Sequence, residues 1–300
     1  MSALSGRPSA GGGVSGVYAI LLVQSLAASG THIVAKVVVH DIDASTLTLV
    51  RSVIAAVAMG VILVARGGWP VIRREDYRLV VGLSILAIPV NQFLFLYGMR
   101  YTIPSNAALL YSTTPIIVLV LSRWLLGEKL TPQRTFGVTL GFVGVTIVIF
   151  ERGISASMEY VYGNMVVFIA VLAWGLYTVY GRRLIVRYGA ISASSVTLIL
   201  GTIAFLPIGL LPACSFSYAT LSAANWGQIL YLGIVTSVVS YLLWYYALGR
   251  IEAGKVALFS NLQPILTTIL AVQLLHQPVT VGFVIGGLVA LGGVVLAQFG

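Results

Sequence analysis

Residues 137–150 read GVTLGFVGVTIVIF and are apolar throughout except for Thr139 and Thr146. A strand of a membrane β-barrel would alternate apolar and polar residues over about ten positions. This stretch does not alternate. Its length and character suit a bilayer-crossing helix, which takes about 20 mostly apolar residues. It therefore predicts a membrane helix, and the rest of the chain has the same character.

The whole chain has the composition of a membrane protein. Of its 300 residues, 59% are hydrophobic and 8% are charged, whereas soluble domains average about 25% charged residues. So few charges cannot cover the surface of a soluble globular protein of this size, and one cysteine cannot support a disulfide scaffold. The composition excludes both classes and predicts an all-α integral membrane protein.

Charges, prolines and glycines divide the chain into ten apolar spans. The expected transmembrane helices are 14–38, 44–65, 79–99, 103–126, 133–150, 161–182, 190–212, 225–248, 254–275 and 280–299. Residues 1–13 are expected to form a cytoplasmic tail. The loops between the spans are too short for an extramembrane domain, so we expect the protein to act inside the bilayer.

The basic residues indicate an orientation. Thirteen of the 17 Lys and Arg fall in loops on one side of the ten spans, and Lys36, Arg51, Arg100 and Arg152 lie on the other. Cytoplasmic loops carry the excess of Lys and Arg, so we expect a multi-pass protein of the inner (plasma) membrane with both termini in the cytoplasm. We expect Lys36 and Arg51 to snorkel to the outer interface. The net charge of +9 then indicates anionic lipid as a partner, not nucleic acid.

The two halves of the chain align at an offset of 149 residues. Matched positions include Tyr97 with Tyr246, Pro115 with Pro264, Gly137 with Gly286, and Gly144 with Gly293. Each half holds five spans, an odd number, so the second repeat (163–299) must insert upside down relative to the first (14–150). Two inverted five-helix repeats are typical of secondary transporters, whose substrate site lies at the repeat interface.

Residues 126–133 read LGEKLTPQ and are followed by Gly137, Gly141 and Gly144. This pattern resembles the signature that closes each repeat of the drug/metabolite transporter superfamily, EamA type, and residues 107–115 and 256–264 look like that family's fourth and ninth helices. At 276–278 the second half reads HQP in place of Gly-Glu-x, which favours a structural role for Glu128. The chain is most similar to bacterial amino-acid exporters, some of which handle aromatic amino acids, and the resemblance implies a transporter and no enzyme.

Small residues recur on two of the spans. Gly137 and Gly141 form a small-xxx-small face, as do Gly286 and Ala290, and such faces let helices approach closely. Because the two faces correspond across the repeat, we expect them to pack within one subunit and the protein to be a monomer. A dimer through these faces is the alternative.

Polar side chains deep in a span are candidates for substrate contact, because lipid penalises them. The offset of 149 pairs Asn91 with Ser240 and Gln92 with Tyr241 at matched depth. The expected substrate-binding residues are Asn91, Gln92, Tyr111, Trp174, Tyr177, Ser240, Tyr241, Trp244 and Asn261. The alternative for each is a helix–helix hydrogen bond or core packing. Tyrosines at span ends, such as Tyr188, are expected in the interfacial belt.

No cofactor or metal site is expected. Residues 249–255, GRIEAGK, fit the spacing of a phosphate-binding loop, but Val256 follows in place of Ser or Thr, and the segment joins two spans. The three histidines are scattered, with no cluster of carboxylates at ligand spacing.

An aromatic, amide-bearing interior suits small neutral metabolites. We expect a secondary transporter that exports them by alternating access, with amino acids, including aromatic ones, as the first class. His32 is the one deep group that titrates near neutral pH, and Lys36 one turn away disfavours its protonation. We therefore expect a uniporter, with proton coupling through His32 as the alternative. Export of drugs, nucleosides or other metabolites on this scaffold stays open, as does a membrane enzyme or a scramblase.

Overall fold

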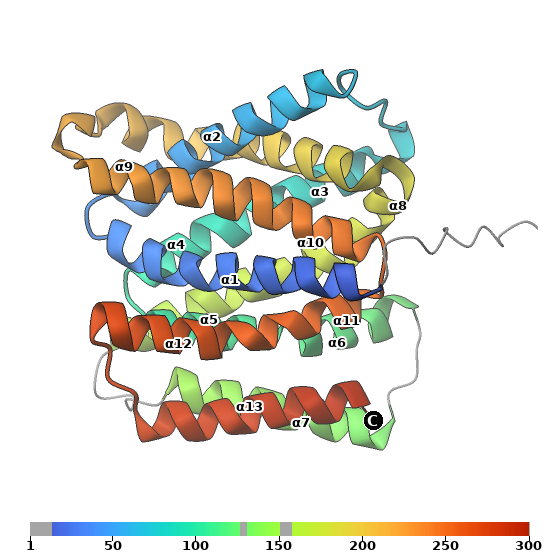
Figure 1. Ribbon diagram of the computed structural model, residues 1–300, viewed down its shortest axis with the longest axis vertical. Coiled ribbons are helices and arrows are strands. Elements are labelled where there is room, and N and C mark those ends of the chain that lie inside the picture. Colours follow the sequence, from blue (N-terminus) through green and yellow to red (C-terminus); the bar gives the residue numbers. More distant parts are fainter. Residues whose placement is uncertain (1–13, 127–130, 151–157, 300) are drawn as a thin grey trace, which may run out of the picture.

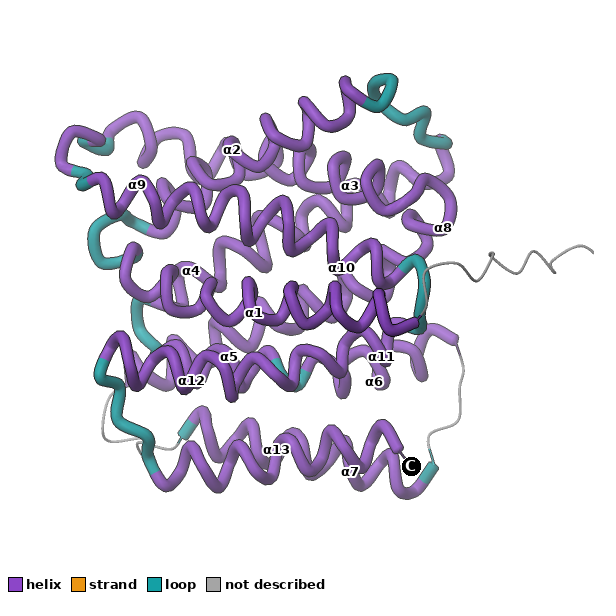
Figure 2. The backbone as a smooth tube through the Cα atoms, in the orientation of Figure 1, coloured by secondary structure: helices purple, strands orange, loops and turns teal. Residues whose placement is uncertain are grey.

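The computed structural model describes residues 14–126, 131–150 and 158–299, and this part of the chain is a bundle of helices with no strand (Figures 1 and 2). The first half holds α1 (Val14–Val38), α2 (Ala44–Ala65), η1 (Arg74–Asp76), α3 (Tyr77–Ile85), η2 (Leu86–Gln92), α4 (Phe93–Met99), α5 (Pro104–Tyr111), α6 (Thr114–Leu126) and α7 (Pro132–Ile149). The second holds α8 (Met158–Ser215), η3 (Tyr218–Thr220), α9 (Ala223–Leu230), η4 (Tyr231–Ser240), α10 (Tyr241–Leu248), α11 (Ala253–Leu258), η5 (Phe259–Asn261), α12 (Leu262–Leu275) and α13 (Val281–Phe299). The all-α prediction is confirmed; the tail 1–13 and Glu128 lie outside the described residues.

Seven helical segments of the described chain are long and apolar enough to cross a membrane. The longest, α8, has 58 residues, which would extend about 87 Å as one straight helix. Gly189 breaks it with a non-helical φ of 80° and ψ of 161°. The limbs before and after this break fold back on each other, because Tyr177 Oη lies 2.9 Å from Thr197 Oγ1 although the two residues are 20 positions apart. The shorter helices α7 and α13 are also apolar.

Helices α7 and α13 lie side by side at one edge of the bundle (Figure 1). A Cβ atom added to Gly144 would lie 2.3 Å from the backbone nitrogen of Ala290, and one added to Gly293 would lie 2.3 Å from that of Gly141. The backbones therefore touch, and residue numbers rise along α7 as they fall along α13, so the pair is antiparallel. The predicted packing of the small-residue faces within one subunit is confirmed.

Helical interruptions occur at corresponding places in the two halves. The π-helical segments η2 and η4 lie inside the third and eighth expected spans. Pro89 lies within η2, where its missing N–H prevents regular α-helical bonding. The fourth and ninth spans are interrupted just before Pro115 and Pro264. Such π turns are frequently found at functional sites, and here they contain buried polar residues such as Asn91, Gln92 and Ser237.

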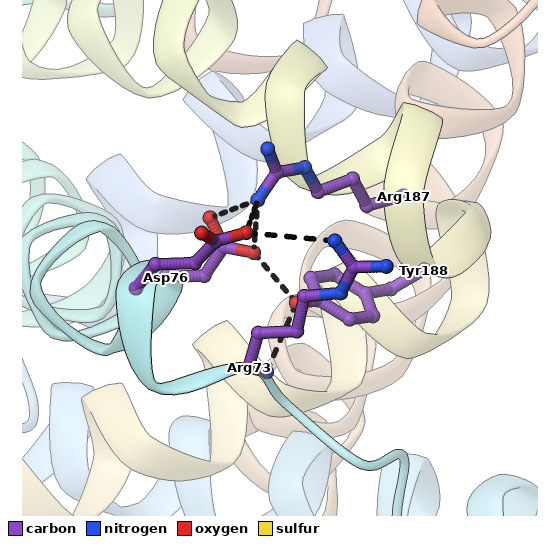
Figure 3. Close-up of polar contacts among 5 residues, drawn as sticks. Arg73, Asp76, Arg187 and Tyr188 are labelled. Atoms are coloured by element: carbon purple, nitrogen blue, oxygen red, sulfur yellow. Dashed lines mark hydrogen bonds and ion pairs between the residues drawn. The ribbon is translucent and has the colours of Figure 1, made fainter.

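The bend at Gly189 is tied to the short helix η1 (Figure 3). Asp76 is buried, and its carboxylate accepts hydrogen bonds from Arg187 Nη1 at 2.8 Å and from Tyr188 Oη at 2.6 Å. The Tyr188 hydroxyl in turn accepts one from the backbone N–H of Arg73 at 3.1 Å. The Tyr188 hydroxyl is held by this buried carboxylate, and its place in the interfacial belt stays a prediction.

Candidate binding cavity

A cavity bordered by residues of both halves of the chain lies inside the bundle. Seven of the residues predicted to contact substrate or to couple transport border it: His32, Asn91, Gln92, Tyr111, Trp174, Ser240 and Tyr241. Cavities with apolar walls and a few placed polar groups typically hold small molecules. This cavity is therefore the candidate site.

Seven further residues border the cavity and were not predicted to do so: Gln24, Ala28, Thr31, Arg51, Phe95, Thr236 and Gln263. Four lining positions of α1, residues 24, 28, 31 and 32, follow the spacing of one helix face. That spacing was present in the sequence, and polar residues along a single face of an apolar span are the signal that would have found them.

Trp174 forms an aromatic wall of the cavity. Its ring centroid lies 5.2 Å from that of Tyr241, 5.4 Å from Trp244 and 5.6 Å from Tyr177. Tyr177 and Trp244 do not border the cavity but stand behind Trp174, and both are buried. Trp244 Nε1 donates a hydrogen bond of 3.3 Å to the hydroxyl of Thr178. These two residues pack against the wall, and their predicted contact with substrate stays a prediction.

The two amides of η2 are held by hydrogen bonds. Asn91 Nδ2 donates to Tyr111 Oη at 2.7 Å and to the carbonyl of Ala170 at 2.8 Å. Gln92 Nε2 donates to Tyr241 Oη at 3.2 Å, and that hydroxyl donates to Asn91 Oδ1 at 3.4 Å. The network joins both halves of the chain, so the polar part of the cavity is organised by the protein itself.

Asn261 does not border the cavity, although the sequence predicts it as a binding residue. It ends the 3-10 segment η5, and Gln263, two positions later, lines the cavity in its place. A 3-10 turn has three residues per turn and so rotates the side chains that follow it. Gln263 Oε1 and His32 Nε2 share a hydrogen bond of 3.2 Å.

The position of Arg51 also differs from the prediction. The sequence placed it at the outer interface, but its side chain is 2% exposed and borders the cavity. Its Nη2 donates to the hydroxyl of Ser237 at 3.1 Å, and that hydroxyl donates to the carbonyl of Leu232 at 2.9 Å. Gly233 lets η4 come close to α2, because a Cβ there would lie 3.2 Å from the Arg51 carbonyl oxygen. Arg51 therefore faces the bundle and not the lipid.

Among the described residues, no group of three or more His, Cys, Asp or Glu side chains is arranged to hold a metal ion. The cavity instead combines hydroxyls, amides, aromatic rings and one guanidinium. This donor set can bind a small polar molecule and orient it.

Comparison with known proteins adds a family relationship. Residues 15–150 and 161–299 each match the EamA-like transporter family. The chain is 29% identical to an uncharacterized transporter, YyaM, of Bacillus subtilis, over 94% of this chain and 93% of that protein. It is 27% identical to a probable terminal-alkyne amino-acid exporter of Streptantibioticus cattleyicolor, over 86% and 83% of the two chains. A crystal structure with 20% identity covers 95% of this chain and 97% of its own, with a TM-score of 0.67, and so shares the fold.

Proposed function

Because the chain belongs to the EamA-like transporter family and is a transporter and not an enzyme, we propose that it exports small neutral metabolites by alternating access. The first class is amino acids, including aromatic ones. One observation carries this proposal: the Trp174–Tyr241 wall and the amides of Asn91 and Gln92 border the same cavity. An aromatic wall suits an apolar or ring-bearing side chain, while amides and hydroxyls suit a zwitterionic backbone. One relative is a probable terminal-alkyne amino-acid exporter, which supports amino acids as the first substrate class to test.

The architecture that we propose for this transport is ten spans in two inverted repeats, 14–150 and 163–299. Helices α7 and α13 are equivalent under the 149-residue offset, and they run antiparallel. Their contacts are also reciprocal, since Gly137 meets Gly293 while Gly286 meets Gly144, and a two-fold relation produces such pairs. Two rigid halves around a shared cavity suit a rocking mechanism.

The topology is tested by labelling single cysteines from either side of the membrane. We propose an inner-membrane protein with cytoplasmic termini. On that topology, cysteines placed at Arg74 and Arg250 are labelled from the cytoplasm and one placed at His40 from outside. Labelling of His40 and Arg74 from the same side would refute the ten-span arrangement.

The transport activity is tested with purified protein in liposomes. Vesicles loaded with an unlabelled amino acid should exchange it for radiolabelled external amino acid, and protein-free vesicles should not. Aromatic and aliphatic amino acids form the first panel, and nucleosides and cationic dyes form the second. Flux of the second panel alone would contradict amino-acid export while leaving the family membership intact.

A further inference from the structure

Arg51 is a buried cation that has no acidic partner among the described residues. Its Nη2 is bonded to Ser237, whereas its Nε and Nη1 have no hydrogen-bond partner in the described part of the chain. The ion pairs found there join other residues: Arg73 and Arg187 with Glu75, Arg187 with Asp76, and Lys255 with Glu252. A buried charge is costly unless it is paired and hydrogen-bonded. The guanidinium thus has donors to spare for an anion.

Further unpartnered atoms border the same cavity. They are Gln24 Oε1, His32 Nδ1, Gln92 Oε1 and Ser240 Oγ. Buried polar atoms in folded proteins are nearly always hydrogen-bonded, so a cluster of exceptions around one cavity indicates atoms that a ligand satisfies. The two amide oxygens are acceptors. They complement Arg51, which can only donate.

We propose that Arg51 binds the carboxylate of the substrate and that the amide oxygens of Gln24 and Gln92 receive its ammonium group. The cavity then selects α-amino acids by their zwitterionic backbone, and the side chain lies against Trp174. This inference rests on the proposed function and names the chemistry of its substrate. The planar guanidinium matches a carboxylate with paired N–H donors. Arg51 is the one permanent cation in the lining, which suits a carboxylate of single charge better than a doubly charged phosphate.

The test measures ligand-induced thermal stabilisation of the full-length protein in detergent, since a ligand that binds the folded state raises the melting temperature. The probes are the common L-amino acids, the amide of each, and monocarboxylates that lack an amine, such as 3-phenylpropionate. We expect amino acids to stabilise the wild type and their amides to do so far less. Arg51→Gln should lose at least about tenfold in apparent affinity for the acids.

Arg78→Gln is the matched control, because Arg78 is an exposed arginine and its loss should leave the binding constants unchanged. Arg51→Lys keeps the charge but not the planar fork and should retain part of the affinity. If Arg51→Gln does not fold, the comparison of acids with amides on the wild type still tests whether the cavity recognises a carboxylate.

The outcomes distinguish failure of the carboxylate site at Arg51 from failure of the proposed amino-acid export. Equal stabilisation by acids and amides, unchanged affinity in Arg51→Gln, or no stabilisation by any carboxylate would overturn the assignment of Arg51. Stabilisation by amine-free carboxylates but by no amino acid, lost in Arg51→Gln, would keep Arg51 as the carboxylate site. That result would overturn both the ammonium site and amino-acid export.

Discussion

Gln92 donates a hydrogen bond of 3.2 Å to the hydroxyl of Tyr241, and the two residues are 149 positions apart in the chain. This separation is the offset that aligns the two halves. Under the proposed two-fold relation, equivalent residues can touch only close to the axis, so the axis passes beside this contact. Because Gln92 and Tyr241 both border the cavity, neither half can form the site without the other. Relative motion of the halves changes the site directly.

Trp174→Ala should raise the KM for transport by about tenfold or more. The change removes the ring that contacts Tyr177, Tyr241 and Trp244, and each aromatic pair contributes about 0.5–1.5 kcal/mol beyond the area that it buries. Trp124→Ala is the matched control, since Trp124 is 84% exposed at the outside of the bundle. Flux is compared at equal amounts of reconstituted protein, and equal effects of the two changes would argue against a binding role for the wall.

Gly144→Ala should destabilise the protein, because the new methyl group would lie 2.3 Å from the backbone nitrogen of Ala290. Backbone atoms cannot give way as a flexible side chain can, and overpacking of this kind costs about 1–3 kcal/mol. Gly292→Ala adds the same methyl group to the partner helix α13 at a position with no atom within 4 Å. The melting temperature in detergent should fall for the first variant and hold or rise for the second.

Arg187→Ala should loosen the bend in α8 at Gly189. The Asp76 carboxylate would lose the guanidinium and keep Tyr188, and the melting temperature should fall only modestly because the Arg187 side chain is 40% exposed. Asp76→Asn in the same variant should recover part of the loss, because a neutral amide needs no cation. Arg182→Ala, an exposed neighbour, serves as the control. If the wild type, Arg187→Ala and Arg182→Ala all unfold at the same temperature, the contact adds nothing to stability.

An imposed pH gradient should not drive substrate above equilibrium in vesicles. His32 is 3% exposed, shares a hydrogen bond with Gln263, and packs against Phe95 and Tyr111, an environment that suits a neutral ring better than a charged one. His32→Ala should weaken transport, and the exposed His40→Ala should not. Accumulation that needs the gradient and disappears in His32→Ala would replace the uniporter with proton coupling.

The positions of the helices follow from the sequence because apolar length and punctuation are local properties. The expected spans 14–38 and 44–65 have the same bounds as α1 and α2. The division of the 58-residue α8 was also expected, since arginines and Gly189 separate the spans 161–182 and 190–212. The π turns of η2 and η4 were not, because no residue type in η4 requires one and their geometry depends on packing between helices.

Cavity-lining residues could be predicted where the internal repeat places polar residues at matched positions. They were missed where packing between helices determines which way a side chain points. Asn91, Gln92, Ser240 and Tyr241 were found from their matched positions, and all four border the cavity. Asn261 does not border the cavity, because it ends a 3-10 turn that rotates the helix following it, and its contact with substrate stays a prediction. The Arg51 side chain was wrongly placed at the outer interface, because the sequence does not distinguish an arginine that snorkels from one that is buried in the bundle. What decides between them is the face of α2 that packs against η4.

The hydrogen bond from Arg51 has a consequence for how the protein is made. Its partner, Ser237, lies 186 residues later in the chain. Bacterial-type synthesis adds about 5–20 residues per second, so Ser237 emerges roughly 10–40 s after Arg51. A guanidinium is costly in hydrocarbon, so through that interval we expect the Arg51 side chain to lie among lipid headgroups or water. We therefore expect α2 to take its final place in the bundle only after η4 has been translated, so that folding of the first half is completed by the second.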